Sequence, residues 1–81
     1  MYTVFIHNDD FTPMDFVVDL LVEVFRKPVN EAFAIMMTVH RSERGAVGRY
    51  SYDMARTKID KATRMARNEG YPLRLSCEPE S

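Results

Sequence analysis

The sequence predicts a small α/β (α+β) domain whose elements follow the order strand, helix, helix, strand, helix, strand. Two patterns predict this order. Short runs rich in β-branched and aromatic residues stand near both ends of the chain, and three longer segments repeat apolar residues at helical spacing. A length of 81 residues adds that these elements form one domain, residues 1–81.

The first strand and the first helix are predicted on either side of a polar junction. Residues 2–7 are mostly β-branched or aromatic, which is typical of a strand. Thr12 is a candidate cap for the following helix, Pro13 suits its first position, and Asp15 would complete a capping box. That helix repeats apolar residues that should face the core: Val17, Leu20, Leu21, Val24 and Phe25.

A second helix is expected from Val29, because Pro28 interrupts the first. Its apolar side continues at the same spacing through Ala32, Phe33, Met36, Met37 and His40. Gly45 and Gly48 then predict a turn-rich segment, and residues 47–52 are the candidate second strand.

The third helix and the last strand complete the pattern. Ser51 is a candidate cap, and one side of the helix repeats mostly small residues: Ala55, Ile59, Ala62 and Ala66. Gly70 should end this helix, and Pro72 should prevent its extension. Residues 73–77 alternate and predict the final strand, and residues 78–81 predict a short acidic tail.

The composition argues against several classes of protein. Eleven basic and twelve acidic residues leave a formal net charge of -1, which gives no bulk attraction to nucleic acid or anionic membranes. Cys77 is the one cysteine, so no internal disulfide can form, and this favours a reducing compartment. The chain opens with no signal peptide, and no apolar run approaches the roughly 20 residues that span a bilayer. We therefore expect a soluble, cytoplasmic protein.

The polar junction at residues 8–14 is the first candidate site. Asn8, Asp9 and Asp10 place an amide and two carboxylates at the end of a strand, beside the apolar start of a helix. One interpretation is a solvated turn, since Asn and Asp are common in turns. The other is a rigid recognition site for a small cationic group such as an amine, which needs a further polar residue from elsewhere.

His40 is the candidate for that further residue. It lies four positions after Met36, on or near the apolar side of the second helix. A lone histidine there is more often a satisfied core or rim residue, but a neutral imidazole nitrogen is also a good acceptor. Asn8, Asp10 and His40 together would offer three acceptors, which matches the three protons of an ammonium group.

Metal binding and catalysis find less support in the sequence. A metal site would draw on His7, Asp9, Asp10 and His40, but the histidines lack a local ligand spacing and no second cysteine helps. No nucleophile has an identifiable base, and no glycine-rich phosphate loop occurs. We therefore expect no metal, no cofactor and no enzymatic activity.

The third helix carries five positive side chains: Arg56, Lys58, Lys61, Arg64 and Arg67. They predict a solvated face opposite the small-residue side. RNA binding is an alternative, but no aromatic residues interleave with the charges. Contact with a partner protein is at least as well supported.

Several of these segments together resemble the ClpS adaptor family. Residues 4–17, which contain the run NDDFTPM at residues 8–14, closely resemble the family signature. Residues 35–40 resemble its methionine-to-histidine segment, and residues 54–58 with residues 71–73 resemble its last helix and strand. The resemblance covers nearly the whole chain, in order and without large gaps.

The resemblance implies a fold and a function. The family fold is a small sandwich of three helices on a three-stranded antiparallel sheet, similar to the C-terminal domain of the ribosomal stalk protein. Such adaptors bind N-degron substrates through a destabilising N-terminal Phe, Tyr, Trp or Leu. They pass these substrates to the ClpA-type unfoldase of the bacterial ClpAP protease. A monomer without nucleic-acid or membrane partners is expected.

The resemblance also implies roles for single residues. Asn8, Asp10 and His40 would hold the substrate α-amino group, with Asp9 beside them. The side-chain pocket would be lined by Ile6, His7, Thr12, Met14, Val17, Met36, Val39 and Leu73.

Two further roles and two departures follow from the same resemblance. Met14 would be the gatekeeper that rejects β-branched side chains, and Asp53 and Lys58 match positions used toward the unfoldase. His7 stands where the family usually has an aliphatic residue, so we expect either a more polar pocket wall or an altered preference among Phe, Tyr, Trp and Leu. Arg56 stands where an acidic residue is common, which bears on the unfoldase contact.

Overall fold

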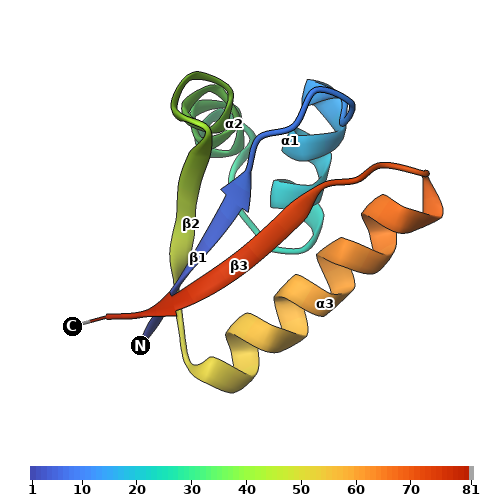
Figure 1. Cartoon of the computed structure of the whole chain (residues 1–81). Coiled ribbons are helices and arrows are strands. Elements are labelled where there is room, and N and C mark those ends of the chain that lie inside the picture. Colours follow the sequence, from blue (N-terminus) through green and yellow to red (C-terminus); the bar gives the residue numbers. More distant parts are fainter. Residues whose placement is uncertain (81) are drawn as a thin grey trace.

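The computed structural model describes residues 1–80, and it confirms the predicted order of elements (Figure 1). These are β1 (Tyr2–His7), α1 (Met14–Glu23), α2 (Val29–Ser42), β2 (Arg44–Tyr50), α3 (Tyr52–Asn68) and β3 (Arg74–Pro79). The strands form one antiparallel sheet in the order β2-β1-β3, so the first strand lies in the middle. None of the helices in this part of the chain is long and apolar enough to cross a membrane.

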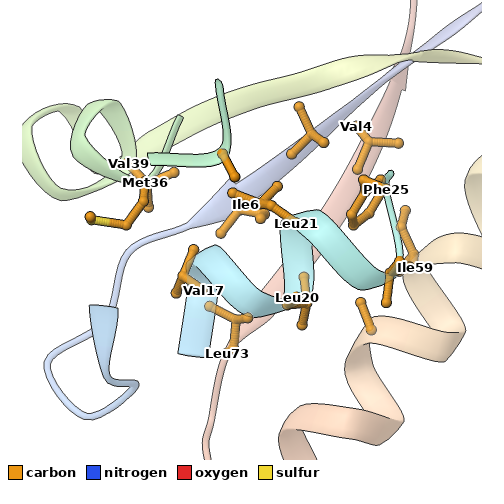
Figure 2. Packing of buried hydrophobic residues seen from close by; sticks show 14 of the residues in the cluster. Val4, Ile6, Val17, Leu20, Leu21, Phe25, Met36, Val39, Ile59 and Leu73 are labelled. Atoms are coloured by element: carbon orange, nitrogen blue, oxygen red, sulfur yellow. The ribbon is translucent and has the colours of Figure 1, made fainter. Parts of the chain in front are cut away.

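The core lies between the sheet and the helices. Val4 and Ile6, at alternate positions of β1, point into the core, where they pack with Leu20 and Leu21 of α1 (Figure 2). All four side chains are fully buried. Burying each such side chain stabilises the fold by about 1.5–3 kcal/mol. The small-residue side of α3 is buried as predicted, through Ala55, Ile59, Ala62 and Ala66.

The start of α1 differs from the predicted capping box. The helix begins at Met14, and Pro13 in front of it provides no side-chain cap. The Thr12 hydroxyl donates to the Asp9 carboxylate at 2.8 Å instead of capping the helix. Asp and Thr side chains readily form hydrogen bonds within their own turn, so the Thr12 hydroxyl bonds to Asp9 in the loop and not to the start of the helix.

The second strand begins earlier than predicted. It starts at Arg44, so Gly45 and Gly48 lie inside the strand rather than in a turn. A Cβ on Gly45 would lie 2.8 Å from Cγ2 of Val39, so glycine lets the last turn of α2 pack closely on β2. Gly48 borders a β-bulge in the pairing with β1, which is another common position for a glycine in a strand.

Both predicted ends of α3 are confirmed. The Ser51 hydroxyl accepts a hydrogen bond from the backbone N–H of Met54 at 3.3 Å. Gly70 takes a φ of 79°, a left-handed conformation that glycine adopts without steric cost at the end of a helix.

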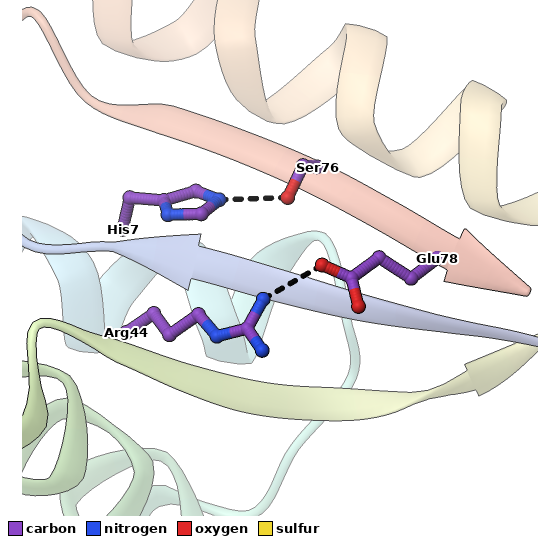
Figure 3. Close-up of polar contacts among 4 residues, drawn as sticks. All are labelled: His7, Arg44, Ser76 and Glu78. Atoms are coloured by element: carbon purple, nitrogen blue, oxygen red, sulfur yellow. Dashed lines mark hydrogen bonds and ion pairs between the residues drawn. The ribbon is translucent and has the colours of Figure 1, made fainter. Parts of the chain in front are cut away.

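The third strand is longer than predicted, and it includes residues that were expected to form an acidic tail. Glu78 pairs with Arg44 at 2.7 Å (Figure 3), and Glu80 pairs with Arg49 at 3.0 Å. These ion pairs connect residues 78–80 with β2, across the central strand of the sheet. The last residue of the predicted tail, Ser81, lies outside the described residues.

The turn between α2 and β2 brings the end of α2 toward the end of β1. Glu43 caps α2 in the left-handed conformation, with a φ of 67°. Its carbonyl oxygen accepts a hydrogen bond from the backbone N–H of Asn8 at 2.7 Å. This turn therefore holds the last turn of α2, which carries His40, beside the loop that follows β1.

Replacing Glu43 with glycine is expected to raise the free energy of unfolding by about 0.5–1 kcal/mol. A residue with a Cβ is strained in the left-handed region by roughly 1–2 kcal/mol, and part of the gain is lost to the greater freedom of glycine in the unfolded chain. Urea denaturation of the two proteins would measure the change. As a matched control, Arg41→Gly inside α2 should lower stability by about 0.5–1 kcal/mol, and destabilisation by both changes would contradict the prediction.

Candidate functional site

The site lies where the loop after β1 meets the last turn of α2. A polar cleft of about 410 Å³ opens there, and it is lined by Asn8, Asp9, Asp10, Phe11, Thr12, Pro13, Met14 and His40. The four residues predicted to surround an amine, Asn8, Asp9, Asp10 and His40, thus line one cleft. They come from two elements that are distant in sequence and are tied together by the bond between Asn8 and Glu43.

Asp9 builds the loop that forms the cleft. One carboxylate oxygen accepts from the backbone N–H groups of Phe11 at 2.8 Å and Thr12 at 2.7 Å, and the other accepts from the Thr12 hydroxyl at 2.8 Å. Burial raises the pKa of Asp9, but these hydrogen bonds, led by the Thr12 backbone, outweigh burial and bring the pKa below its ordinary value of 3.8. The carboxylate therefore stays ionised and rigid at neutral pH.

Asn8, Asp10 and His40 differ from Asp9 in that their side chains are free. All three are exposed, and within residues 1–80 none of their side chains takes part in a hydrogen bond or an ion pair. The side-chain oxygen atoms of Asn8 and Asp10 and one imidazole nitrogen of His40 are thus available as acceptors. A loop fixed by Asp9 with three free acceptors around it suits a ligand that donates several hydrogen bonds, such as an ammonium group.

A narrow apolar cavity adjoins the polar cleft. It has a volume of about 20 Å³ and is lined by Asn8, Thr12, Met14, Val17, Met36, Val39 and His40. Four of these residues also line the cleft: Asn8, Thr12, Met14 and His40. The cavity is large enough for about one water molecule, so a bulky side chain can enter only if the flexible Met14 and Met36 side chains move aside.

Two other residues predicted to line the pocket lie deeper. Ile6 is 0% exposed and Leu73 is 1% exposed, and neither borders the cleft or the narrow cavity. Figure 2 shows them in the same packed cluster as Val17, Met36 and Val39. They can therefore support the cavity wall from within the core without reaching a ligand directly.

His7 lies on the other face of the sheet, which corrects the expectation that it forms part of the pocket wall. Its Nε2 lies 2.7 Å from the Ser76 hydroxyl, near the ion pair between Arg44 and Glu78 (Figure 3). Burial, and then the positive charges of Arg74 and Arg44, bring the pKa of His7 below its ordinary value of 6.5. His7 is thus a neutral residue of the outer sheet surface at pH 7.

Asp53 and Lys58 lie on α3, away from the cleft. Asp53 is exposed in the first turn of the helix. Lys58 is half-buried, and its ammonium group donates to the carbonyl oxygen of Val24 at 3.0 Å. The same group lies 5.9 Å from the Phe25 ring centre and 5.5 Å from that of Tyr50. Lys58 therefore joins α3 to the end of α1, where a helix leaves carbonyl groups unpaired.

Lys58→Ala is expected to lower the free energy of unfolding by about 1–3 kcal/mol. The change removes a hydrogen bond from a charged donor, worth about 1.5–3 kcal/mol, and its cation–π contacts, worth about 0.5–1 kcal/mol. Lys61→Ala is the matched control, because Lys61 is exposed on the same helix and should change stability by less than about 0.5 kcal/mol. Equal stability of the two variants in thermal or urea unfolding would contradict this role.

The other positive residues of α3 are also partly engaged within the fold. Arg67 donates to the carbonyl oxygens of Tyr71 and Leu73 at 2.7 and 2.9 Å, and Arg56 pairs with Asp60 at 3.4 Å. The helix therefore uses much of its positive charge on its own chain rather than presenting it as one uniform surface. This arrangement weakens the case for RNA binding.

Some residues at the site did not stand out in the sequence. Phe11 is 77% exposed and lines the polar cleft, and Phe33 is 54% exposed although its spacing predicted a core position. Val18 and Asp19 border a further hollow between α1 and α2 that Phe33 also lines. The sequence offered one signal for Phe11. It directly follows two aspartates, in a loop where few apolar residues could bury it.

The predicted alternative of a metal site is not assembled by the described residues. Within residues 1–80, no group of three or more His, Cys, Asp and Glu side chains could hold a metal ion. The proposed ligands divide between two places, because His7 faces Ser76 on the outer sheet surface while Asp10 and His40 line the cleft.

Comparisons with known proteins agree on one family. The model of the ClpS family, described as the ATP-dependent Clp protease adaptor protein ClpS, matches residues 1–76. A ClpS adapter protein of Nitratidesulfovibrio vulgaris is 54% identical over 96% of this chain and 75% of the relative. Those of Acetivibrio thermocellus and Deinococcus radiodurans are 49% and 47% identical, over 99% and 100% of this chain and 81% and 72% of the relatives.

A solved structure also has the same fold. It is that of Agrobacterium tumefaciens ClpS2 bound to L-phenylalaninamide, and it matches with a TM-score of 0.94 at 39% sequence identity. The match covers 98% of this chain and 95% of that one. The curated relatives above are named as protease adapters, not as enzymes.

Proposed function

The chain belongs to the ClpS family of ATP-dependent Clp protease adaptor proteins, and on that premise we propose that it selects substrates by their N-terminal residue. The residues selected are Phe, Tyr, Trp and Leu. The adaptor then delivers these N-degron substrates to a ClpA-type unfoldase of the ClpAP protease in the bacterial cytoplasm. It acts as a monomer of one domain, residues 1–81, and as an adaptor it is not an enzyme.

The polar cleft binds the substrate α-amino group in this proposal. The amino group has a pKa of about 8, so it is mostly charged at pH 7 and donates three hydrogen bonds. Asn8, Asp10 and His40 accept these bonds, and Asp9 holds the loop in place from within. Each hydrogen bond to a charged group contributes about 1.5–3 kcal/mol.

The narrow cavity takes the first side chain of the substrate. Its walls come from Thr12, Met14, Val17, Met36 and Val39, with Ile6 and Leu73 packed behind them in the core. Burying a large apolar side chain contributes about 1.5–3 kcal/mol, which favours Phe or Leu over Ser. The solved ClpS2 structure, whose ligand is L-phenylalaninamide, supports an amine next to an aromatic side chain as the recognised group.

The shared walls of the cleft and the cavity are the observation that carries this proposal. Asn8, Thr12, Met14 and His40 border both hollows, so the amino group and the side chain of one residue can be bound at the same time. An internal residue of a folded protein offers a bulky side chain but no free amine. The site therefore favours chain ends over internal segments.

Asp53 and Lys58 form the contact with the unfoldase in this proposal. Asp53 is exposed and can pair with a positive residue of the unfoldase. Lys58 reaches Val24 within its own chain, so its part in the contact includes fixing the position of α3. No cofactor is needed for either step.

A reconstituted degradation assay tests the delivery step. A fluorescent reporter that begins with Phe is mixed with a ClpA-type unfoldase and its peptidase, and loss of fluorescence is followed with and without the adaptor. The adaptor should accelerate loss of the Phe reporter but not of a matched reporter that begins with Val. Equal degradation of the two reporters, or no effect of the adaptor, would contradict the proposed function.

A further inference from the structure

The outer face of the sheet carries polar and charged side chains that the proposed function does not use. Val4 and Ile6 point from β1 into the core, so Phe5 and His7 lie on the opposite face. Figure 3 shows part of this face, where the side chains of β2 and β3 approach those of β1. Phe5 and His7 are only half-buried, so this surface is accessible to a ligand.

Positive charge is concentrated in one row across the three strands. His7 of β1 pairs directly with Arg44 of β2 on one side and with Arg74 of β3 on the other. Like charges at directly opposite positions destabilise a sheet. Burial and then the positive charges of Arg74 and Arg44 lower the pKa of His7, which agrees with a close approach of the three side chains. A bound anion would relieve the repulsion in this row.

Arg44 is already oriented on this face. Its guanidinium lies 4.0 Å from the centre of the Phe5 ring, and it pairs with Glu78 at 2.7 Å. Beside it, the Ser76 hydroxyl lies 2.7 Å from Nε2 of His7. Because these contacts fix the guanidinium in advance, a ligand would not have to order it on binding.

Arg74 supplies a positive charge that has no partner of its own. It is exposed, and within residues 1–80 its side chain takes part in no hydrogen bond or ion pair. Glu78 is the carboxylate that acts on His7, and it is paired with Arg44. Two guanidinium groups therefore face one carboxylate, and guanidinium groups match the geometry of a phosphate group well.

We propose that Arg74, Arg44 and the Ser76 hydroxyl bind a phosphate group on the outer face of the sheet, next to His7. The phosphate group comes from inorganic phosphate or from a nucleotide. None of these residues lines the cleft or the narrow cavity, so the inference does not depend on the proposed function. The chain then has a site for an anion in addition to its site for an amine.

Titration of the protein with three probes tests this site. Sodium phosphate, AMP and adenosine are added at constant ionic strength, and the NMR signals of each residue are followed. Phosphate and AMP should shift the signals of His7, Arg74 and Ser76, whereas adenosine should not, because it has no phosphate group. Tighter binding of AMP than of phosphate would identify a nucleotide as the source, and equal affinities would identify free phosphate.

Variants of single charges separate this site from the overall charge. Arg74→Gln should weaken phosphate binding at least about three-fold, as expected for an exposed ion pair. Arg64→Gln is the matched control, because Arg64 is exposed on α3 and its loss removes the same charge elsewhere. Glu78→Gln should strengthen binding at least about three-fold, since it removes the carboxylate that competes for Arg44.

His7 provides a second readout within the site. Arg74 and Arg44 disfavour its charged form, and Glu78 favours that form. A sulfate ion keeps two negative charges around neutral pH, and when bound it should stabilise the protonated ring. The pKa of His7, measured by NMR, should therefore be higher in sulfate than in chloride of equal ionic strength. Arg74→Gln should reduce this difference.

Three outcomes would overturn the inference. The first is equal phosphate affinity of the parent protein and the Arg74→Gln variant. The second is a His7 pKa that is the same in sulfate and in chloride. The third is a set of phosphate-induced signal shifts centred on the positive residues of α3 instead of the outer sheet face.

Discussion

Replacing His40 or Asp10 with alanine is expected to weaken binding of a Phe-starting peptide at least ten-fold. Each change removes one acceptor from the charged α-amino group, and such hydrogen bonds contribute about 1.5–3 kcal/mol. A loss of about 1.4 kcal/mol corresponds to a factor of ten in affinity. Both side chains are exposed and unpaired within residues 1–80, so the fold should tolerate either change.

The measurement is fluorescence anisotropy with the labelled peptide, accompanied by thermal unfolding of each variant. Asp53→Ala is the matched control, because Asp53 is another exposed aspartate but lies on α3 away from the cleft. It should bind the peptide like the parent protein and fail only in delivery. Parent-like binding by both the His40 and the Asp10 variant would contradict the amine-binding role of the cleft.

Replacing Met14 with alanine is expected to let the site accept β-branched first residues. Met14 lines both the polar cleft and the narrow cavity, so in the proposed binding mode it lies beside the β-carbon of the first residue, where a second branch would clash with it. Overpacking of this kind typically costs about 1–3 kcal/mol. Removing the side chain should therefore improve binding of Val- and Ile-starting peptides about ten-fold or more, with a much smaller change for Phe.

Anisotropy with peptides that differ only in the first residue would measure this discrimination. Met37→Ala is the control, because Met37 also belongs to a helix beside the site but lines neither the cleft nor the cavity. Its ratio of Phe to Val affinities should equal that of the parent protein. If the Met14 variant rejected Val as strongly as the parent, another residue would have to enforce the selection.

The sequence was sufficient to predict the order of the elements because each segment has a clear period. The predictions failed where a contact formed in the fold overrides the usual local preference of a residue. Gly45 resembles a turn residue, but it lies in β2 because a Cβ there would clash with Val39. Thr12 resembles a helix cap, but Asp9 provides a closer partner for its hydroxyl.

The candidate site was predictable in part. The run from Asn8 to Met14 and His40 are recognisable in the sequence, and the structure places them around two hollows that share lining residues. The strand period already separates His7 from Ile6, since neighbouring residues of a strand face opposite sides. The hollow between α1 and α2 was not predictable, because the exposure of Phe33 depends on how α2 packs against α1.

Recognition of the α-amino group is tested most directly by comparing a labelled peptide that begins with a free Phe with the same peptide after N-terminal acetylation. Acetylation removes the positive charge and most of the donors that Asn8, Asp10 and His40 are proposed to bind, while the Phe side chain is unchanged. We expect micromolar or tighter binding of the free peptide and at least ten-fold weaker binding of the acetylated one. Equal affinity for both peptides would contradict it, because the site would then recognise the side chain without the amine.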